Sequence, residues 1–572
     1  MTPAFLPLLL PLLLAAPAPQ EPAPDLAGAL RRHVEVLADD ALQGRESGTF
    51  AGDQAAWYLA GAFEAAGLRP AGEGGTFLQA FPVALPPEPG ECVVQAGRQG
   101  WSAGTLALSA SASVSAPLVD AGYGVVLESH GMNEYRDADA EGKIVLVRRY
   151  SEFGVNPDPP FTELGALRPK LKAAAEAGAV GVILGTHPAD LARGGEAEIP
   201  FGAAPGRLPI PVVTVAPEVV AALEDLLARE AEPVVTIAAE VQRSEARTFN
   251  VLGLLPGRSA EVLVVGAHYD HLGFGGEGSL APGVHEVHNG ADDNASGSAV
   301  VLELARRMAA AEEPPERSVL FALWGAEERG LLGSAWWVKH PTVEGERILA
   351  NLNLDMVGRL QGGAITVGSA ETCAAFEAAL EAASPDPEAL AFRRTGGSLP
   401  GGGGSDHMSF HQAEIPALFF FSGLHADYHK PSDDAEKLDY GRMAVLTEAL
   451  DTLVRELGRR PRAEFAWVAP APDPRAREVR GSRAWFGSIP DYAAAPEGGG
   501  MQIAGVSPGG PAEKAGLQEG DILKRVGGEE IHDIYDFMDA MADRKPGDRI
   551  EVVFLREGEE LRVEVVLGSR GG

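Results

Sequence analysis

The stretch GADDNASG, residues 290–297, lies at the centre of the pattern that decides the fold of this chain. Four other short stretches rich in acidic residues and histidine surround it: GAHYDH (266–271), WGAEE (324–328), NLDM (353–356) and YHKPSDD (428–434). Apolar runs typical of buried strands stand just ahead of them: EVLVV (261–265), SVLFAL (318–323), ILANLNL (348–354) and ALFFF (417–421). Because open α/β sheets place their sites at the carboxyl ends of the strands, we expect these polar side chains to converge at one edge.

Segments with helical spacing of apolar residues alternate with these strands, at 300–310, 329–340, 372–383 and 441–457. Alternating strands and helices predict an α/β fold, with a mainly parallel mixed sheet flanked by helices. We assign residues 244–460 to the core of this domain and residues 20–90, which contain further helical patterns, to its N-terminal part.

The converging residues offer carboxylate and imidazole donors, which suit zinc or a similar divalent ion. A two-zinc hydrolase needs a carboxylate that bridges both ions, further ligands that complete each shell, and an unligated carboxylate that moves the proton. For these roles the sequence offers Asp293 as the bridge, Glu327 as the general base, and His268, Glu328, Asp355 and His429 as the remaining ligands. Asp270 follows His268 by two residues, so we expect its carboxylate to accept the other N–H of that imidazole.

The chain offers no competing catalytic motif. It contains no His-Glu-x-x-His, no Gly-x-Ser-x-Gly and no phosphate-binding loop ending in Gly-Lys-Ser/Thr. His425 is an alternative to His429 as the last ligand. We prefer His429 because Tyr428 precedes it and Pro-Ser-Asp-Asp follows it.

The five stretches resemble the co-catalytic zinc aminopeptidases of peptidase clan MH, family twenty-eight. Their pattern is His-x-Asp after a strand, Asp-Asp/Asn in a Gly-rich turn, a Glu-Glu pair, Asp-Met, and Tyr-His near the end. The resemblance implies two Zn²⁺ per chain, with His268 and Asp355 on one ion, Glu328 and His429 on the other, and Asp293 shared. It also implies that Tyr428 stabilises the oxyanion, that the peptide bond between Asp293 and Asn294 is cis, that His271 is not a ligand, and that His407 lines the pocket.

This family resemblance predicts an aminopeptidase that removes N-terminal residues from peptides with a free N-terminus. A metal-bridging hydroxide would attack the first peptide carbonyl, with Glu327 as the general base that later protonates the leaving amine. Another zinc exopeptidase or a glutaminyl cyclase on the same scaffold is the first alternative. A non-catalytic receptor or scaffold is the second, but such relatives lose ligands, whereas every ligand position is filled here.

Two further segments resemble known modules. Residues 91–243 are similar to a protease-associated domain inserted into the catalytic domain, which serves as a structural lid or as a recognition element. Residues 461–480 read as a Pro- and Ala-rich linker. Residues 481–570 resemble a PDZ domain of exported bacterial proteases, in which Trp485, Phe486 and Gly487 would cage the terminal carboxylate of a bound peptide or protein ligand. The alternative is that this domain only packs against the core.

Composition limits the partners and the compartment. The 572 residues include 81 acidic and 47 basic ones, a formal charge of −34 that argues against nucleic acid as a partner. Residues 1–19 form an apolar, Leu-rich run with small residues at its end, which predicts a signal peptide and a periplasmic or extracellular protein. No stretch is long and apolar enough for a stable membrane span. The two cysteines, Cys92 and Cys373, are expected to be free.

Overall fold

The computed structural model describes residues 25–127, 132–152, 165–204, 206–276, 278–281, 283–344, 347–395, 404–469, 484–490, 496, 499–506, 510–532, 536–537, 540–541 and 544–569. The predicted signal peptide, most of the Gly-rich segment 398–407 and most of the predicted linker lie outside the described residues.

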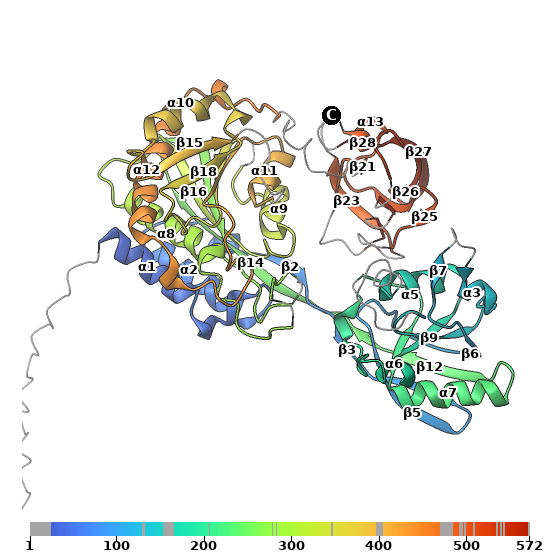
Figure 1. Ribbon diagram of the computed structural model, residues 1–572. Coiled ribbons are helices and arrows are strands. Elements are labelled where there is room, and N and C mark those ends of the chain that lie inside the picture. The colour runs from blue at the N-terminus through green and yellow to red at the C-terminus, as the bar shows by residue number, and fades with distance from the viewer. Residues whose placement is uncertain are drawn as a thin grey trace, which may run out of the picture.

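A nine-stranded mixed sheet forms the centre of the catalytic domain (Figure 1). Its four middle strands are mutually parallel: β16 (Arg317–Trp324), β15 (Ser259–His268), β17 (Ile348–Leu354) and β20 (Ala417–Phe421). Antiparallel neighbours flank them, β14 (Glu245–Leu255) beside β16 and β18 (Ala364–Gly368) beside β20. The remaining strands are β1 (Arg69–Pro70), β2 (Leu78–Ala84) and β19 (Ala391–Thr395). The predicted fold class and the four predicted strands are confirmed.

Helices cover both faces of this sheet because its strands are apolar on both sides. Successive residues point to opposite faces, so Leu263 and Val265 pack into one buried cluster while Val262 and Val264 pack into another. The first cluster is covered by α1 (Leu26–Leu37), α2 (Phe50–Ala65), α8 (Gly297–Ala309), α10 (Ala374–Ala383) and α12 (Tyr440–Arg459). The second is covered by α9 (Leu332–Lys339) and α11 (His407–Gln412).

The N-terminal part of the domain begins with α1 and α2, as predicted. Side chains cap both helices: Asp25 accepts a hydrogen bond from the Gly28 amide at 2.8 Å, and Thr49 accepts one from the Gly52 amide at 3.2 Å. A short helical turn, η1 (Asp40–Arg45), connects them. Strand β2, which the helical patterns within 20–90 did not reveal, follows and pairs with β14.

The inserted domain is a closed barrel of seven strands. In order around the barrel they are β10 (Gly181–Gly185), β11 (Val212–Val215), β5 (Gln99–Thr105), β4 (Cys92–Ala96), β12 (Val234–Ala239), β6 (Ala112–Asp120) and β9 (Ile144–Arg148). Helices α5 (Leu167–Glu176) and α7 (Pro217–Arg229) pack outside it. The chain enters along β2 and returns along β14, so the barrel extends from one corner of the core (Figure 1).

The C-terminal domain has a sheet of β22 (Ser488–Pro490), β23 (Met501–Val506), β24 (Ile522–Val526), β26 (Arg549–Arg556) and β27 (Glu559–Val566), with β25 (Glu529–Glu530) beside β24. The domain also contains the short helix α13 (Pro511–Lys514), and β26 and β27 form its closing hairpin. Strand β22 lies at an edge of the described sheet.

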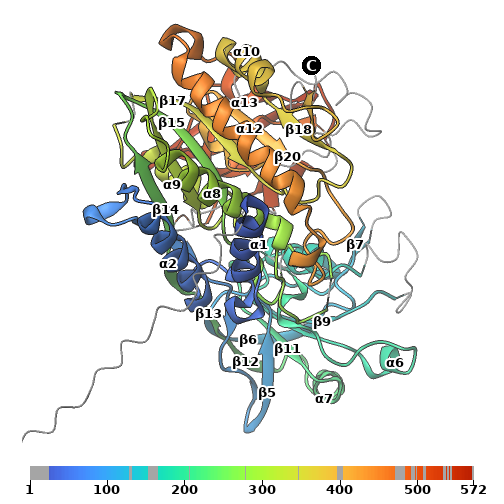
Figure 2. The same ribbon diagram turned by 90° about the vertical axis from the view of Figure 1, so that its left-hand side faces the viewer.

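Ion pairs attach this C-terminal domain to both of the others. Arg168 on α5 places Nη2 2.7 Å from Asp536 Oδ1, with side chains only 11% and 2% exposed. Lys172, one turn further along α5, contacts Glu529 at 3.4 Å. Lys339 of the catalytic domain contacts Glu519 at 3.2 Å. Figure 2 shows the three parts from the side. Among the described residues, no helix is both long enough and apolar enough to pass through a bilayer.

Candidate metal centre

The carboxyl ends of the parallel strands bring the predicted residues together. His268 is the last residue of β15, Glu327 and Glu328 follow β16, and Asp355 follows β17 directly. His429 lies in the segment after β20. The predicted site residues therefore converge at one edge of the sheet, as the strand pattern led us to expect. Some of them are more than 150 positions apart in the sequence.

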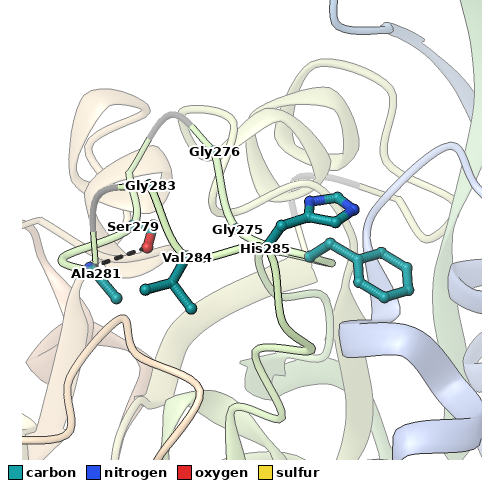
Figure 3. Close-up of a pocket in the computed structure, with 8 residues that line it drawn as sticks. Gly275, Gly276, Ser279, Ala281, Gly283, Val284 and His285 are labelled. Atoms are coloured by element: carbon teal, nitrogen blue, oxygen red, sulfur yellow. Dashed lines mark hydrogen bonds between the residues drawn. The ribbon is translucent and has the colours of Figure 1, made fainter.

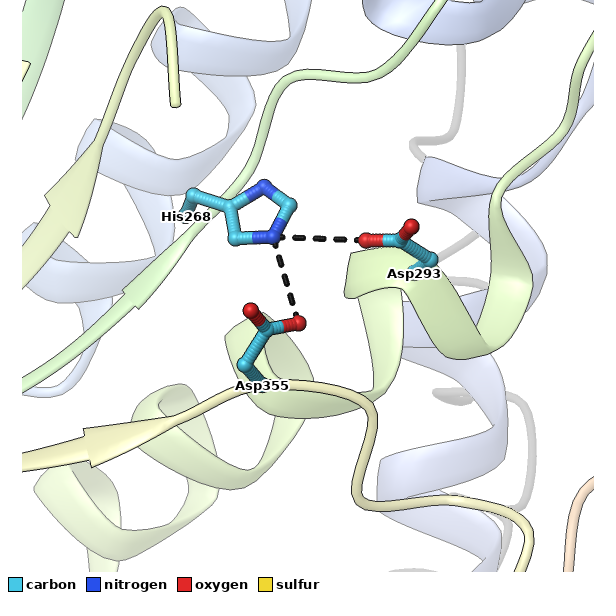
Figure 4. Close-up of side chains that lie close together, drawn as sticks. All are labelled: His268, Asp293 and Asp355. Atoms are coloured by element: carbon cyan, nitrogen blue, oxygen red, sulfur yellow. Dashed lines mark hydrogen bonds and ion pairs between the residues drawn. The ribbon is translucent and has the colours of Figure 1, made fainter. Parts of the chain in front are cut away.

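The first group of ligand atoms contains His268, Asp293 and Asp355 (Figure 4). The Nε2 atom of His268 lies 3.3 Å from Asp293 Oδ1 and 3.3 Å from Asp355 Oδ1. Burial opposes protonation of His268, but Glu327 and Asp355 raise its pKa well above the usual value. A positive charge at this point is thus strongly favoured, whether a proton or a metal ion supplies it.

A second group shares Asp293 and adds Glu328. His429 Nε2 lies 3.2 Å from Asp293 Oδ2 and 3.3 Å from Glu328 Oε2, as the predicted ligand set requires. His271 lies closer still to Glu328, because its Nδ1 is 2.6 Å from Glu328 Oε1. The two imidazole rings meet edge to face, with centroids 5.7 Å apart. Two histidines, not one, therefore face Glu328.

Sequence reasoning placed His271 outside the ligand set, but its side chain, with Asp293 and Glu328, forms a group whose ligand atoms all lie within 4.8 Å of one another. The second His of His-Tyr-Asp-His was the available signal. Its spacing of three from His268 could not show which way the chain turns after the strand.

The predicted contact between the Asp270 carboxylate and His268 is wrong in detail. The carboxylate oxygen lies 3.9 Å from Nδ1, whereas the backbone carbonyl of Asp270 lies at 3.2 Å. Strand β15 ends at His268, so the alternation of an extended chain no longer applies two residues later. The buried carboxylate accepts the Glu327 amide hydrogen at 3.0 Å instead. Asp270 thus connects the end of β15 to the segment that carries the Glu pair.

Glu327 lies near the first group without belonging to either group. Its Oε2 is 3.9 Å from His268 Nε2. Burial raises the pKa of Glu327 well above the usual value; His268 opposes this shift and Asp355 adds to it. Asp406, which the sequence reasoning did not single out, is fully buried close by, and burial raises its pKa to about 7.

The GADDNASG turn presents Asp293 between the two groups. The peptide bond between Asp293 and Asn294 is cis, as predicted. Asp433 accepts hydrogen bonds from the amides of Asp292 (2.8 Å) and Asp293 (3.1 Å), which holds the turn. Burial alone would raise the pKa of Asp293, but hydrogen bonds from His268 and His429 lower it well below the usual value.

The remaining aromatic and histidine side chains lie around this centre. The Tyr428 ring stacks on His429 with centroids 3.8 Å apart, and burial raises the pKa of its hydroxyl, with Asp293 adding to the shift. His425 Nε2 lies 3.2 Å from Asp292 Oδ2, so it contacts the turn and belongs to neither ligand group. The buried His407 ring stacks on Phe419 at 4.3 Å.

A small pocket of about 290 Å³ lies in the loop that precedes the turn (Figure 3). Phe274, Ala281 and Val284 line it together with Ser279, His285 and three glycines. The same loop holds the predicted ligand His429: Gly278 O lies 2.7 Å from its Nδ1, and the Leu280 amide donates to its carbonyl at 2.9 Å. The pocket is therefore built from the segment that supports the second group.

The three residues predicted for the PDZ ligand site lie just ahead of β22, and Trp485 ends the short strand β21 (Ala484–Trp485). Trp485 pairs with Gly568, the Phe486 side chain is buried, and Gly487 has a φ of +83° that favours glycine. The Phe486 ring meets Phe537 edge to face at 5.1 Å. The described part of β22 pairs only with β23, which leaves an edge of the kind that accepts an added strand.

The donor set fits zinc. The carboxylates of Asp293, Glu328 and Asp355 are gathered in a buried site, where like charges are unfavourable unless a cation binds among them. Imidazole and carboxylate are also the donors that zinc accepts in proteins. Fold and site together define a metallohydrolase of the α/β class.

Comparison with known families identifies this class more closely. Residues 250–454 match the family model "Peptidase family M28", residues 114–223 match "PA domain" and residues 486–567 match "PDZ domain". The chain thus contains an M28 peptidase domain, a PA domain and a PDZ domain. The PA match lies within the inserted barrel, as the sequence resemblance led us to expect.

Relatives cover different parts of the chain. Aminopeptidase YwaD of Bacillus subtilis is 29% identical over 369 residues, which is 62% of this chain and 71% of its own length. Leupeptin-inactivating enzyme 1 of Streptomyces exfoliatus is 33% identical over 196 residues, 34% of this chain and 40% of its own. A solved zinc aminopeptidase from Bacillus subtilis aligns with a TM-score of 0.45 at 24% identity, over 77% of this chain and 98% of that one.

Proposed function

We propose that this M28 peptidase is an exported aminopeptidase that binds two zinc ions and removes N-terminal residues from peptides. The observation that carries the proposal is the pair of ligand groups that share Asp293, because a carboxylate common to two groups can bridge two ions. The similarity to proteins named aminopeptidases supports the choice of substrate. Export rests on the apolar run at 1–19.

Each ion would have its own residues in this proposal. His268 and Asp355 would hold one ion, Glu328 and His429 would hold the other, and Asp293 contacts both histidines. When bound, zinc lowers the pKa of water and polarises the scissile carbonyl. Side chains of the protein would carry out the proton transfer and help to stabilise the oxyanion.

Glu327 is the proton carrier in this scheme. It stands beside the first group without joining it, and burial keeps its pKa raised, as a general base working near neutral pH requires. It accepts a proton from the attacking water and returns it to the departing amine. The Tyr428 hydroxyl, kept protonated by burial, donates a hydrogen bond to the carbonyl oxygen as negative charge develops there.

The pocket in the loop that contacts His429 is the candidate subsite for a substrate side chain. Its wall of Phe274, Ala281 and Val284 suits an apolar group, and its loop contacts a proposed ligand directly. At the other end of the chain, the free edge of β22 supports binding of an extended peptide by the PDZ domain.

Hydrolysis of an aminoacyl-anilide panel by zinc-loaded protein tests the activity. We expect release of the anilide only from substrates with a free amine. Turnover of N-acetylated substrates at the same rate would contradict aminopeptidase action, and cyclisation of an N-terminal glutamine without hydrolysis would favour the glutaminyl cyclase alternative. Metal analysis of the same sample should give two zinc ions per chain.

A further inference from the structure

The segment 44–47, which we call the clasp, lies behind the metal centre although it carries none of the predicted ligands. It comprises the last two residues of η1 and the two that follow, ahead of α2, and the whole inserted domain separates it in sequence from every ligand. Its Arg45 is fully buried and its Ser47 is 1% exposed. It also lies outside the part of the chain matched by the M28 family model.

Arg45 binds the backbone at four points. Its Nε donates to Tyr269 O at 2.7 Å, and Nη1 donates to Leu37 O at 2.5 Å and Asn289 O at 2.6 Å. Its Nη2 donates to Gly290 O at 2.9 Å. Tyr269 lies between His268 and Asp270, and residues 289 and 290 begin the turn that presents Asp293. One guanidinium therefore connects the end of β15 to that turn, and only its planar fork of donors can do so.

The charge of Arg45 also acts on the centre. Burial lowers its pKa to about 10, while Asp270, Asp293, Asp433 and Glu328 act in the opposite direction. The side chain remains a cation at neutral pH. This fixed positive charge, bound to carbonyl oxygens behind the site, reduces the unfavourable electrostatic free energy of placing several carboxylates close together. It does so without occupying a ligand position.

The other residues of the clasp reach the remaining loops of the centre. Ser47 Oγ accepts the Ala326 amide hydrogen at 2.8 Å, immediately before Glu327. At Gly44 the chain approaches so closely that an added Cβ would lie 2.5 Å from Gly273 O and 2.6 Å from His288 O. These two carbonyls belong to the ends of the pocket loop that holds His429.

We propose that the clasp fixes the three ligand-bearing loops relative to one another, with Arg45 as a positioning residue for the bridging Asp293. The proposal rests on the two-ion site proposed above. The isolated M28 core would then lack a component of its metal centre, which the N-terminal segment supplies.

The test compares zinc binding by full-length variants. Arg45→Lys keeps the charge but loses the fork, and Ser47→Ala removes one acceptor with little change in volume. Arg317→Lys is the matched control, because Arg317 is another buried arginine that binds Leu457 O and Arg460 O, at the opposite end of β16. The number of ions and their affinities come from competition with a chromophoric chelator, and cobalt substitution gives a spectrum that reports ligand geometry.

We expect Arg45→Lys to weaken zinc binding about 10–100-fold and to alter the cobalt spectrum, the range seen when groups that support ligands are changed. Ser47→Ala should weaken one of the two binding steps. Arg317→Lys should lower the unfolding temperature and leave both steps unchanged. If Arg45→Lys does not fold, zinc binding by Ser47→Ala alone tests the proposal.

Two outcomes separate the proposals. If the parent protein binds fewer than two zinc ions, the proposed function is wrong. If the parent binds two ions and both clasp variants bind them with parental affinity, or if Arg45→Lys and Arg317→Lys weaken binding equally, the clasp has no positioning role.

Discussion

Replacing Glu327 by Gln separates the proposed base from the neighbouring ligand. Gln has almost the same shape, and the contact of residue 327 with Asp270 is made by its backbone amide, so the substitution leaves that contact intact. Glu327 belongs to neither ligand group, and its Oε2 lies 3.9 Å from His268 Nε2. The variant should therefore fold and keep both zinc ions.

The expected loss is in the chemical step. Removing a general base commonly lowers kcat about 10²–10⁴-fold, which corresponds to roughly 3–5 kcal/mol of transition-state stabilisation at 1.36 kcal/mol per factor of ten. The measured quantities are kcat on an aminoacyl-anilide and zinc content by elemental analysis on the same preparation. KM should change little, because the lost interaction belongs to proton transfer.

Glu328→Gln is the matched comparison, because the two side chains are adjacent and chemically identical. Glu328 contacts both His271 and His429, so its loss should weaken one ion first, and added zinc should restore part of the activity. If Glu327→Gln loses zinc while Glu328→Gln keeps both ions, the assignment within the pair is reversed.

Three further outcomes are expected. Deleting the PDZ domain (481–570) should leave kcat on small anilides unchanged and alter KM for long peptides; loss of small-substrate turnover in a folded truncation would mean that this domain completes the active site. Arg168→Glu should break the contact with Asp536 and speed cleavage of the 461–480 linker by trypsin in limited proteolysis; an unchanged cleavage rate would show that other contacts hold the domains. Burial lowers the pKa of Lys170 from 10.5 to about 7, so below pH 7 folded and unfolded chains both carry the proton, and between pH 7 and 10 the unfolded chain binds it more strongly. The free energy of unfolding should then rise with pH over this interval, and Lys170→Met should flatten that rise in chemical denaturation at pH 7 and 9; an equal slope in the variant would contradict the shift.

The central fold could be predicted because the sequence pattern and the packing agree. The runs at 348–354 and 417–421 coincide with β17 and β20, since strands buried on both faces must be apolar throughout. The helical pattern around β2 gave no indication of a strand there. The pairing of β2 with β14 also depends on residues more than 150 positions away. Such long-range pairing leaves no local signal.

The candidate site likewise contains some residues that could be predicted from the sequence and others that could not. His268, the last residue of β15, and Asp355, the first residue after β17, could be predicted from the sequence because the strand fixes where they point. Asp270 and His271 lie after β15 has ended, so their directions depend on the turn and could not be read from spacing. Arg45 lies in a turn-rich stretch whose composition indicates nothing, and only its four carbonyl partners reveal its place in the structure.

The way in which the PA domain joins the core has a consequence for protein engineering. Ala84 and Glu245, at the ends of β2 and β14, are paired neighbours, and beyond them Pro89 pairs with Val241. The whole barrel is thus grafted onto the tip of a hairpin, where a tight two-residue turn could replace it. The same tip can receive a foreign domain whose termini lie side by side, such as a fluorescent reporter. The peptidase would thereby become a scaffold for sensors without any change to the strands that support its centre.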